Sequence, residues 1–173
     1  MKRRLISMLY VLKEHIMYIV LSFILIFIMS NLLKKCLYVI SIVTAFMYIT
    51  SIYSLGWNSS NKAYKAYTSP GNAHKKDTIR YSIYDGFINP IPLLVIGIAV
   101  FVLSITKSLI WPFNIYNLAF GFIVRNGNGD MIIPFAIIAT FLPYITYSLG
   151  YILGKDGKIF FIKYLPKVVY KKK

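Results

Sequence analysis

The chain has 173 residues, 58% of which are hydrophobic, and carries a formal net charge of +15. That apolar content excludes a soluble domain, whose exposed apolar patches rarely exceed about a few hundred Å², and the lysines lie at the ends of apolar runs, which argues against nucleic acid as a partner. A single cysteine excludes an intramolecular disulfide and a multi-cysteine metal cluster.

Four apolar windows are long enough to cross a bilayer, whose hydrocarbon core of roughly 30 Å takes about 20 helical residues. They cover residues 16–33, 36–55, 87–106 and 131–154. Lys13 and Glu14 mark the inner edge of the first window. We expect no ionisable side chain in the middle of any span, which counts against a proton-coupled pump. The sequence therefore predicts an all-α fold, an integral membrane four-helix bundle that forms one transmembrane domain over residues 1–173.

The distribution of basic residues predicts the orientation, because cytoplasmic loops carry an excess of Lys and Arg. With both termini in the cytoplasm, sixteen of the 20 basic residues lie on the cytoplasmic side. Residues 56–86 then form a cytosolic loop, and residues 155–173 form a cytosolic basic tail. Residues 108–124 are apolar but interrupted by proline and asparagine, so we expect an external segment at the membrane interface. A fifth span is the alternative for this segment.

Neutral hydroxyl groups recur at helical spacing on the second and fourth spans, where each set shares one helix face. The residues are Ser41, Thr44, Tyr48, Thr140, Tyr144, Tyr147 and Tyr151. One interpretation is a hydrogen-bonded packing seam, and the other is a pocket for a neutral or amphiphilic ligand between the two spans. Gly150 and Gly154 form a small-xxx-small pair, which predicts a close helix contact at the end of the last span.

The cytosolic loop contains His74, Asp77 and Arg80 at spacings of three, so they are neighbours if this segment is helical. They suggest either a membrane enzyme or metal site that includes Asp85, or an ion pair and a solvated histidine beside anionic lipid head groups. The chain has no HExxH, nucleophile elbow or Gly-rich phosphate loop, and we expect no enzyme, metal or cofactor. Lipid head-group contacts are expected at Lys163, Lys167, Lys171, Lys172 and Lys173.

Three loose motifs resemble an uncharacterised type of small multi-pass bacterial membrane protein. They are Gly56-Trp57, the run His74-Lys75-x-Asp77-x-x-Arg80, and the glycine-containing end of the last span with its lysine tail. The resemblance implies a shared design of the cytosolic loop and no particular activity.

Taken together, these features predict a non-enzymatic component of a bacterial cytoplasmic membrane. We expect an accessory subunit or a homo-oligomer, whose basic loop and tail contact anionic lipids of the inner leaflet or another membrane protein. A small transport component with a neutral ligand between the second and fourth spans is one alternative. A membrane enzyme that uses His74, Asp77 and Arg80 is the other.

Overall fold

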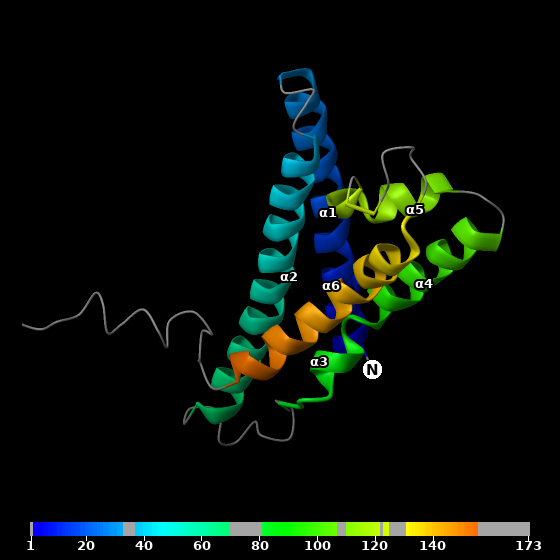
Figure 1. The fold of residues 1–173 in the computed structure, drawn as a ribbon. Coiled ribbons are helices and arrows are strands. Elements are labelled where there is room, and N and C mark those ends of the chain that lie inside the picture. The colour runs from blue at the N-terminus through cyan, green and yellow to red at the C-terminus, as the bar shows by residue number, and fades with distance from the viewer. Residues whose placement is uncertain are drawn as a thin grey trace, which may run out of the picture.

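The computed structural model describes residues 2–32, 37–69, 81–106, 110–121, 123–124 and 131–155. Over these residues it contains helices and no β-strand. The elements are α1 (Lys2–Leu32), α2 (Leu37–Thr68), α3 (Asp85–Ile88), α4 (Ile91–Thr106), α5 (Ile110–Tyr116), the 3-10 turn η2 (Leu118–Phe120) and α6 (Ile133–Gly154) (Figure 1). Four segments are long and apolar enough to cross a membrane, the same number as the predicted windows. They are Arg4–Ile28, Val39–Thr68, Asp85–Thr106 and Ile133–Gly154.

The first two helices are longer than the sequence predicts. α1 begins at Lys2 rather than Ile16, and α2 continues to Thr68 rather than ending at Leu55. Neither extension contains a proline, and their charged residues are good helix formers, so nothing in them stops the helix. At 1.5 Å per residue each helix is about 46–48 Å long. The first part of the predicted cytosolic loop is therefore helical.

α2 and α6 pack with their backbones in close contact, because glycines lie between them. A methyl group at Gly150 would overlap the carbonyl oxygen of Tyr53, and one at Gly154 would overlap that of Trp57. Gly56 provides the reciprocal contact from α2, against the carbonyl oxygen of Tyr147. The predicted close approach at the glycine pair is thus confirmed, and it joins the second span to the last.

The beginning of α1, the beginning of the third span and the ends of α2 and α6 gather at one end of the bundle (Figure 1). Arg4 Nε contacts Asp85 Oδ1 at 2.9 Å, which fastens α1 to α3. Ser148 Oγ donates to the Gly86 carbonyl at 3.0 Å, which fastens α3 to α6. The four spans therefore alternate in direction.

The segment between the third and fourth spans packs into the bundle. Phe113, Tyr116 and Asn117 are buried, and Thr44 Oγ1 donates to the Ala119 carbonyl of η2 at 3.1 Å. α5 has seven residues and rises only about 10 Å, so the described part of this segment supplies no fifth span. Its contacts with α1, α2 and α4 hold it against helix flanks.

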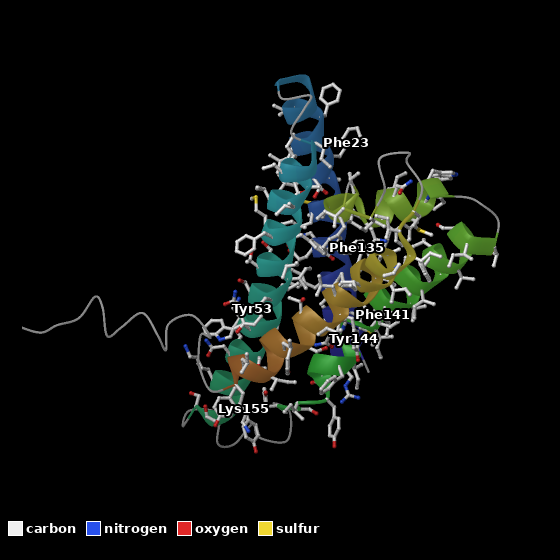
Figure 2. The ribbon with its side chains drawn as sticks, in the orientation of Figure 1. Phe23, Tyr53, Phe135, Phe141, Tyr144 and Lys155 are labelled. Atoms are coloured by element: carbon white, nitrogen blue, oxygen red, sulfur yellow. The ribbon has the colours of Figure 1, made fainter. Side chains whose placement is uncertain are left out.

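α1 lies at the edge of the bundle. Only 17% of its best apolar window is buried within the chain, against 50% for the window in α6. Large apolar side chains point outward along it; Phe23, for example, projects away from the bundle (Figure 2) and is 61% exposed. Such a surface suits lipid or a neighbouring membrane helix, where apolar side chains meet apolar surroundings.

Candidate functional site

Three consecutive ionisable residues, Lys13, Glu14 and His15, lie inside the first candidate span. Arg4, the first residue of this candidate span, pairs with Asp85, the first residue of the third candidate span. Glu14 is ten residues beyond Arg4, which places it about 15 Å along α1, half the thickness of a hydrocarbon core. The candidate span thus includes the triplet, whereas the sequence predicts that Lys13 and Glu14 lie at the edge of the first window.

His15 is the centre of a buried aromatic cluster that joins three helices. Its ring is 3% exposed, and its Nδ1 lies 2.6 Å from the Tyr48 hydroxyl of α2. On the other side the ring packs against Tyr116 of α5, with centroids 4.4 Å apart. Tyr116 donates its hydroxyl proton to the Leu93 carbonyl of α4 at 2.6 Å. Through this single histidine, α1 is connected to both α2 and the α5 segment.

The cluster around His15 is dense. Beside it lies a cavity of about 10 Å³, lined partly by Tyr18, Tyr48 and Asn117, which has room for no more than one water molecule. Burial raises the pKa of Tyr116, so its hydroxyl remains a proton donor. This arrangement stabilises the junction of the helices and leaves no space for a larger ligand.

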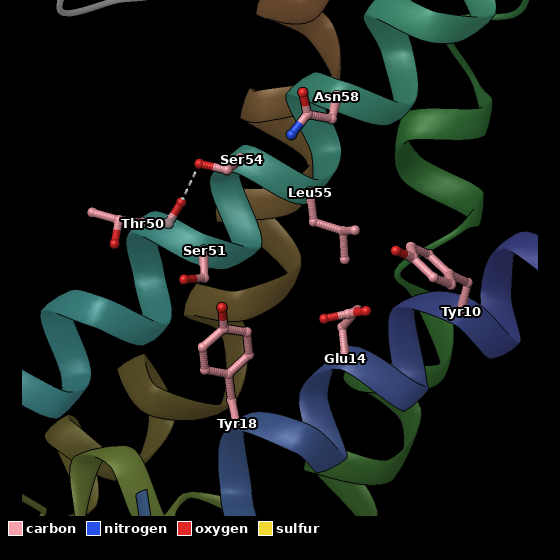
Figure 3. A pocket seen from close by; sticks show the side chains of 8 residues that line it. All are labelled: Tyr10, Glu14, Tyr18, Thr50, Ser51, Ser54, Leu55 and Asn58. Atoms are coloured by element: carbon pink, nitrogen blue, oxygen red, sulfur yellow. Dashed lines mark hydrogen bonds between the residues drawn. The ribbon is translucent and has the colours of Figure 1, made fainter. Parts of the chain in front are cut away.

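Glu14 points into a different space, because successive helical residues are turned by about 100°. It lines an open cleft of about 280 Å³ between α1 and α2 (Figure 3). Tyr10 and Tyr18 flank it at spacings of four on α1, and the α2 wall presents hydroxyl and amide groups. The lining residues are Tyr10, Glu14, Tyr18, Thr50, Ser51, Ser54, Leu55 and Asn58.

The chemistry of this cleft is that of a cation site. Glu14 supplies its only carboxylate, and among the described residues that carboxylate has no hydrogen-bond or ion-pair partner. Hydroxyl and amide oxygens around it add further acceptors. Among the described residues no three His, Cys, Asp or Glu side chains gather as metal ligands. An ammonium or another monovalent cation is the group that one carboxylate and several neutral oxygens best accommodate.

Lys13 is exposed, precedes Glu14 on α1, and is not among the residues that line the cleft. Its Nζ lies 6.0 Å from the centroid of the Tyr10 ring, which is a long cation–π distance. Adjacent residues of a helix do not face each other, so Lys13 is turned away from its own Glu14. The two opposite charges are therefore displayed side by side without being paired.

The hydroxyl sets predicted on the second and fourth spans have separate surroundings. On α2, Ser41 and Thr44 direct their hydroxyls to the Ala119 carbonyl of η2, and Tyr48 contacts His15 of α1. These three residues hold the α5–η2 segment and α1 against α2.

On α6, Thr140 donates to the Ala136 carbonyl of its own helix at 2.8 Å. Tyr147 stacks on Tyr151 with centroids 6.3 Å apart, and Tyr151 stacks on Tyr81 at 6.0 Å. Tyr144 is half-buried. Tyr147 and Tyr151 therefore pack the C-terminal half of α6, where the glycine contact also lies.

An apolar groove of about 330 Å³ lies between the first half of α2 and the first half of α6, where the two helices are farther apart than at the glycine contact. η2 forms its third wall. The lining residues are Ile42, Ala45, Phe46, Ile49, Phe120, Ile123, Val124, Phe135, Ile138, Ala139 and Leu142. A groove of this chemistry suits a hydrocarbon chain.

Other predicted sites lie outside the described residues. This applies to His74, Asp77 and Arg80 of the loop, and to the tail residues Lys163, Lys167, Lys171, Lys172 and Lys173. Those predictions stand as they were made.

A hydropathy window ends where charges begin, so the first window excludes Lys13, Glu14 and His15. The signal for a longer helix was present: residues 5–12 on the other side of Lys13 are themselves mostly apolar. A helix that continues across the charged triplet places it between two apolar halves.

No protein-family model matches this sequence, and neither the curated proteins nor the solved structures contain a match to it. The resemblance to small multi-pass bacterial membrane proteins therefore stays a prediction.

Proposed function

We propose that this chain is a non-enzymatic, homo-oligomeric component of a bacterial cytoplasmic membrane. The observation on which this depends is the exposure of Lys13 inside the candidate membrane span Arg4–Ile28. An apolar helix at the edge of a bundle can face lipid. A lysine within the apolar part of such a helix raises the free energy of insertion if it faces lipid.

The cost can be estimated from the position. A lysine at the centre of a membrane helix disfavours insertion by about 2.5–3.5 kcal/mol. Lys13 is nine residues from Arg4, which corresponds to about 14 Å along the helix. A lysine side chain extends about 6 Å, so snorkelling covers less than half of that distance. A protein neighbour that supplies acceptors on this face removes the penalty, which favours an oligomer over a monomer.

The number of copies per particle tests this proposal directly. We expect the full chain, extracted with its surrounding lipid by a styrene–maleic acid polymer, to contain two or more copies when weighed by native mass spectrometry. Particles that contain one copy at every expression level would refute the homo-oligomer.

The proposed orientation has both termini in the cytoplasm, with the lysine-rich ends against anionic lipid. It is supported by the charge distribution and by the Arg4–Asp85 pair, which lies at the end of the bundle where α1 begins and α6 ends. Reporter fusions to each end check it. Fluorescence from a cytoplasmic reporter is expected at both ends, and activity of a periplasmic reporter at either end would contradict the orientation.

A second candidate function is favoured by the apolar groove between α2, η2 and α6: a transport component that holds an amphiphilic ligand by its hydrocarbon chain. Ala45→Phe would fill the groove from α2 and is expected to weaken binding of the fluorescent fatty acid cis-parinaric acid at least about tenfold. Leu149→Phe, on the exposed face of α6 away from the groove, is the matched control. Equal binding by wild type and the Ala45 variant would reject a ligand site there.

A further inference from the structure

The α1–α2 cleft is incomplete as it stands. Glu14 faces hydroxyl and amide groups, and the described residues give it no cationic partner. Ser54 and Asn58 on the opposite wall are exposed, so the cleft is open along its length. An unpaired carboxylate at this depth marks a site whose counter-charge comes from elsewhere.

The missing counter-charge has a source in the same sequence. Lys13 precedes Glu14, is exposed, and is not among the residues that line the cleft of its own chain. Its ammonium group has three donors, which match one carboxylate and the neighbouring hydroxyl oxygens. One surface of the chain therefore displays both halves of an ion pair.

Symmetry turns these two halves into a complete contact. Two copies inserted in the same orientation are related by a two-fold axis along the membrane normal, so equivalent residues lie at equal depth. Lys13 and Glu14 differ in height by only about 1.5 Å. An ammonium from one copy is then level with the carboxylate of the other, and the reverse contact forms at the same time.

We propose that the cleft between α1 and α2 receives Lys13 of a second copy of this chain, so that two Lys13–Glu14 ion pairs form across a two-fold interface. The proposal rests on the homo-oligomer proposed above and names its contact surface. The hydroxyls of Tyr10 and Tyr18 border the bound ammonium and satisfy its remaining donors. The exposed apolar residues four positions before and after Lys13, Leu9 and Met17, form the rest of the interface.

Charge reversal tests this arrangement, because the two single variants are complementary to each other. Full-length chains with donor or acceptor fluorophores on terminal peptide tags are reconstituted into phosphatidylcholine–phosphatidylglycerol vesicles. Energy transfer is followed as lipid dilutes the protein. We expect Lys13→Glu and Glu14→Lys each to weaken self-association at least about tenfold. In the mixture of the two variants, every contact is again between opposite charges, and association is expected to return to within about threefold of wild type.

Two controls separate pairing from misfolding and from net charge. Lys62→Glu makes the same charge change on an exposed residue of α2 outside the cleft, and we expect association like that of wild type. Circular dichroism melting of each variant verifies that its helices are intact. The restored mixture is itself a control, since a chain that cannot fold is not rescued by a partner.

Each outcome has a definite meaning. Wild-type chains that associate while both single variants associate equally well would overturn the cleft contact and leave the homo-oligomer standing. Single variants that dissociate without recovery in the mixture would overturn the reciprocal pairing. Wild-type chains that show no energy transfer at any dilution would overturn both proposals.

Discussion

Gly150 is the position where a single added methyl group tests the α2–α6 contact. Its Cβ would overlap the carbonyl oxygen of Tyr53 and lie 3.1 Å from that carbonyl carbon and 3.2 Å from the amide nitrogen of Trp57. All three are backbone atoms of α2, so the overlap is relieved only if the two helices separate. In a helix without this contact, alanine in place of glycine would be stabilising by about 0.5–1 kcal/mol. A decrease in the free energy of unfolding on Gly150→Ala therefore indicates that the contact exists, and an increase indicates that it does not.

Overpacking of a close contact costs about 1–3 kcal/mol. After the gain in helix propensity is subtracted from the middle of this range, we expect Gly150→Ala to lower the free energy of unfolding by about 1 kcal/mol. Reversible unfolding by sodium dodecyl sulfate in mixed micelles, followed by circular dichroism, measures this difference. Leu149→Ala is the control, because Leu149 is 51% exposed on the adjacent face, and its effect should stay within about 0.5 kcal/mol. A Gly150→Ala chain as stable as wild type, or more stable, would refute the contact.

Three further substitutions address the remaining junctions. Tyr48→Phe removes the hydroxyl that lies 2.6 Å from His15 Nδ1, and the unpaired ring nitrogen is expected to cost about 1 kcal/mol in the same unfolding assay; unchanged stability would contradict the bond. Thr44→Val removes a hydroxyl that donates to η2, and we expect faster hydrogen exchange in η2, whereas unaltered exchange would show that the bond does not hold this turn. Arg4→Gln breaks an ion pair to Asp85 in which the arginine side chain is 53% exposed, so a loss of less than about 1 kcal/mol, smaller in high salt, is expected; a larger loss would mean that this end of α1 is buried by something else.

The sequence is sufficient to predict the helical class and the number of spans, because a run of about 20 apolar residues has few other stable solutions. It also predicts the glycine contact, since Gly150 and Gly154 follow a spacing with a direct steric meaning. The window for the first span covers only the second part of α1, because a hydropathy window ends at charged residues such as Lys13. Helix formation depends on the backbone, which continues through charged residues without interruption.

The spacing of residues along one helix does not predict which polar side chains pair across two helices. His15 and Tyr48 are separated by 33 positions, and only the packing of α1 against α2 brings them together. The hydroxyls of the second span were grouped correctly on one face, but spacing gives no indication that this face meets α1 and η2. Tertiary packing decides which element contacts a given helix face. The face of α2 that carries Ser41 and Thr44, for example, contacts η2, which follows α5.

The glycine contact between α2 and α6 also divides the molecule into a stiff part and a movable part. Backbones that touch through glycines cannot slide past each other without collision, so these two helices behave as one rigid frame. α1 is attached to that frame through side chains and through an ion pair at its first turn. Because the buried His15 is next to Glu14, any displacement of α1 at the cleft has to disturb the contact of His15 with Tyr48 of that frame.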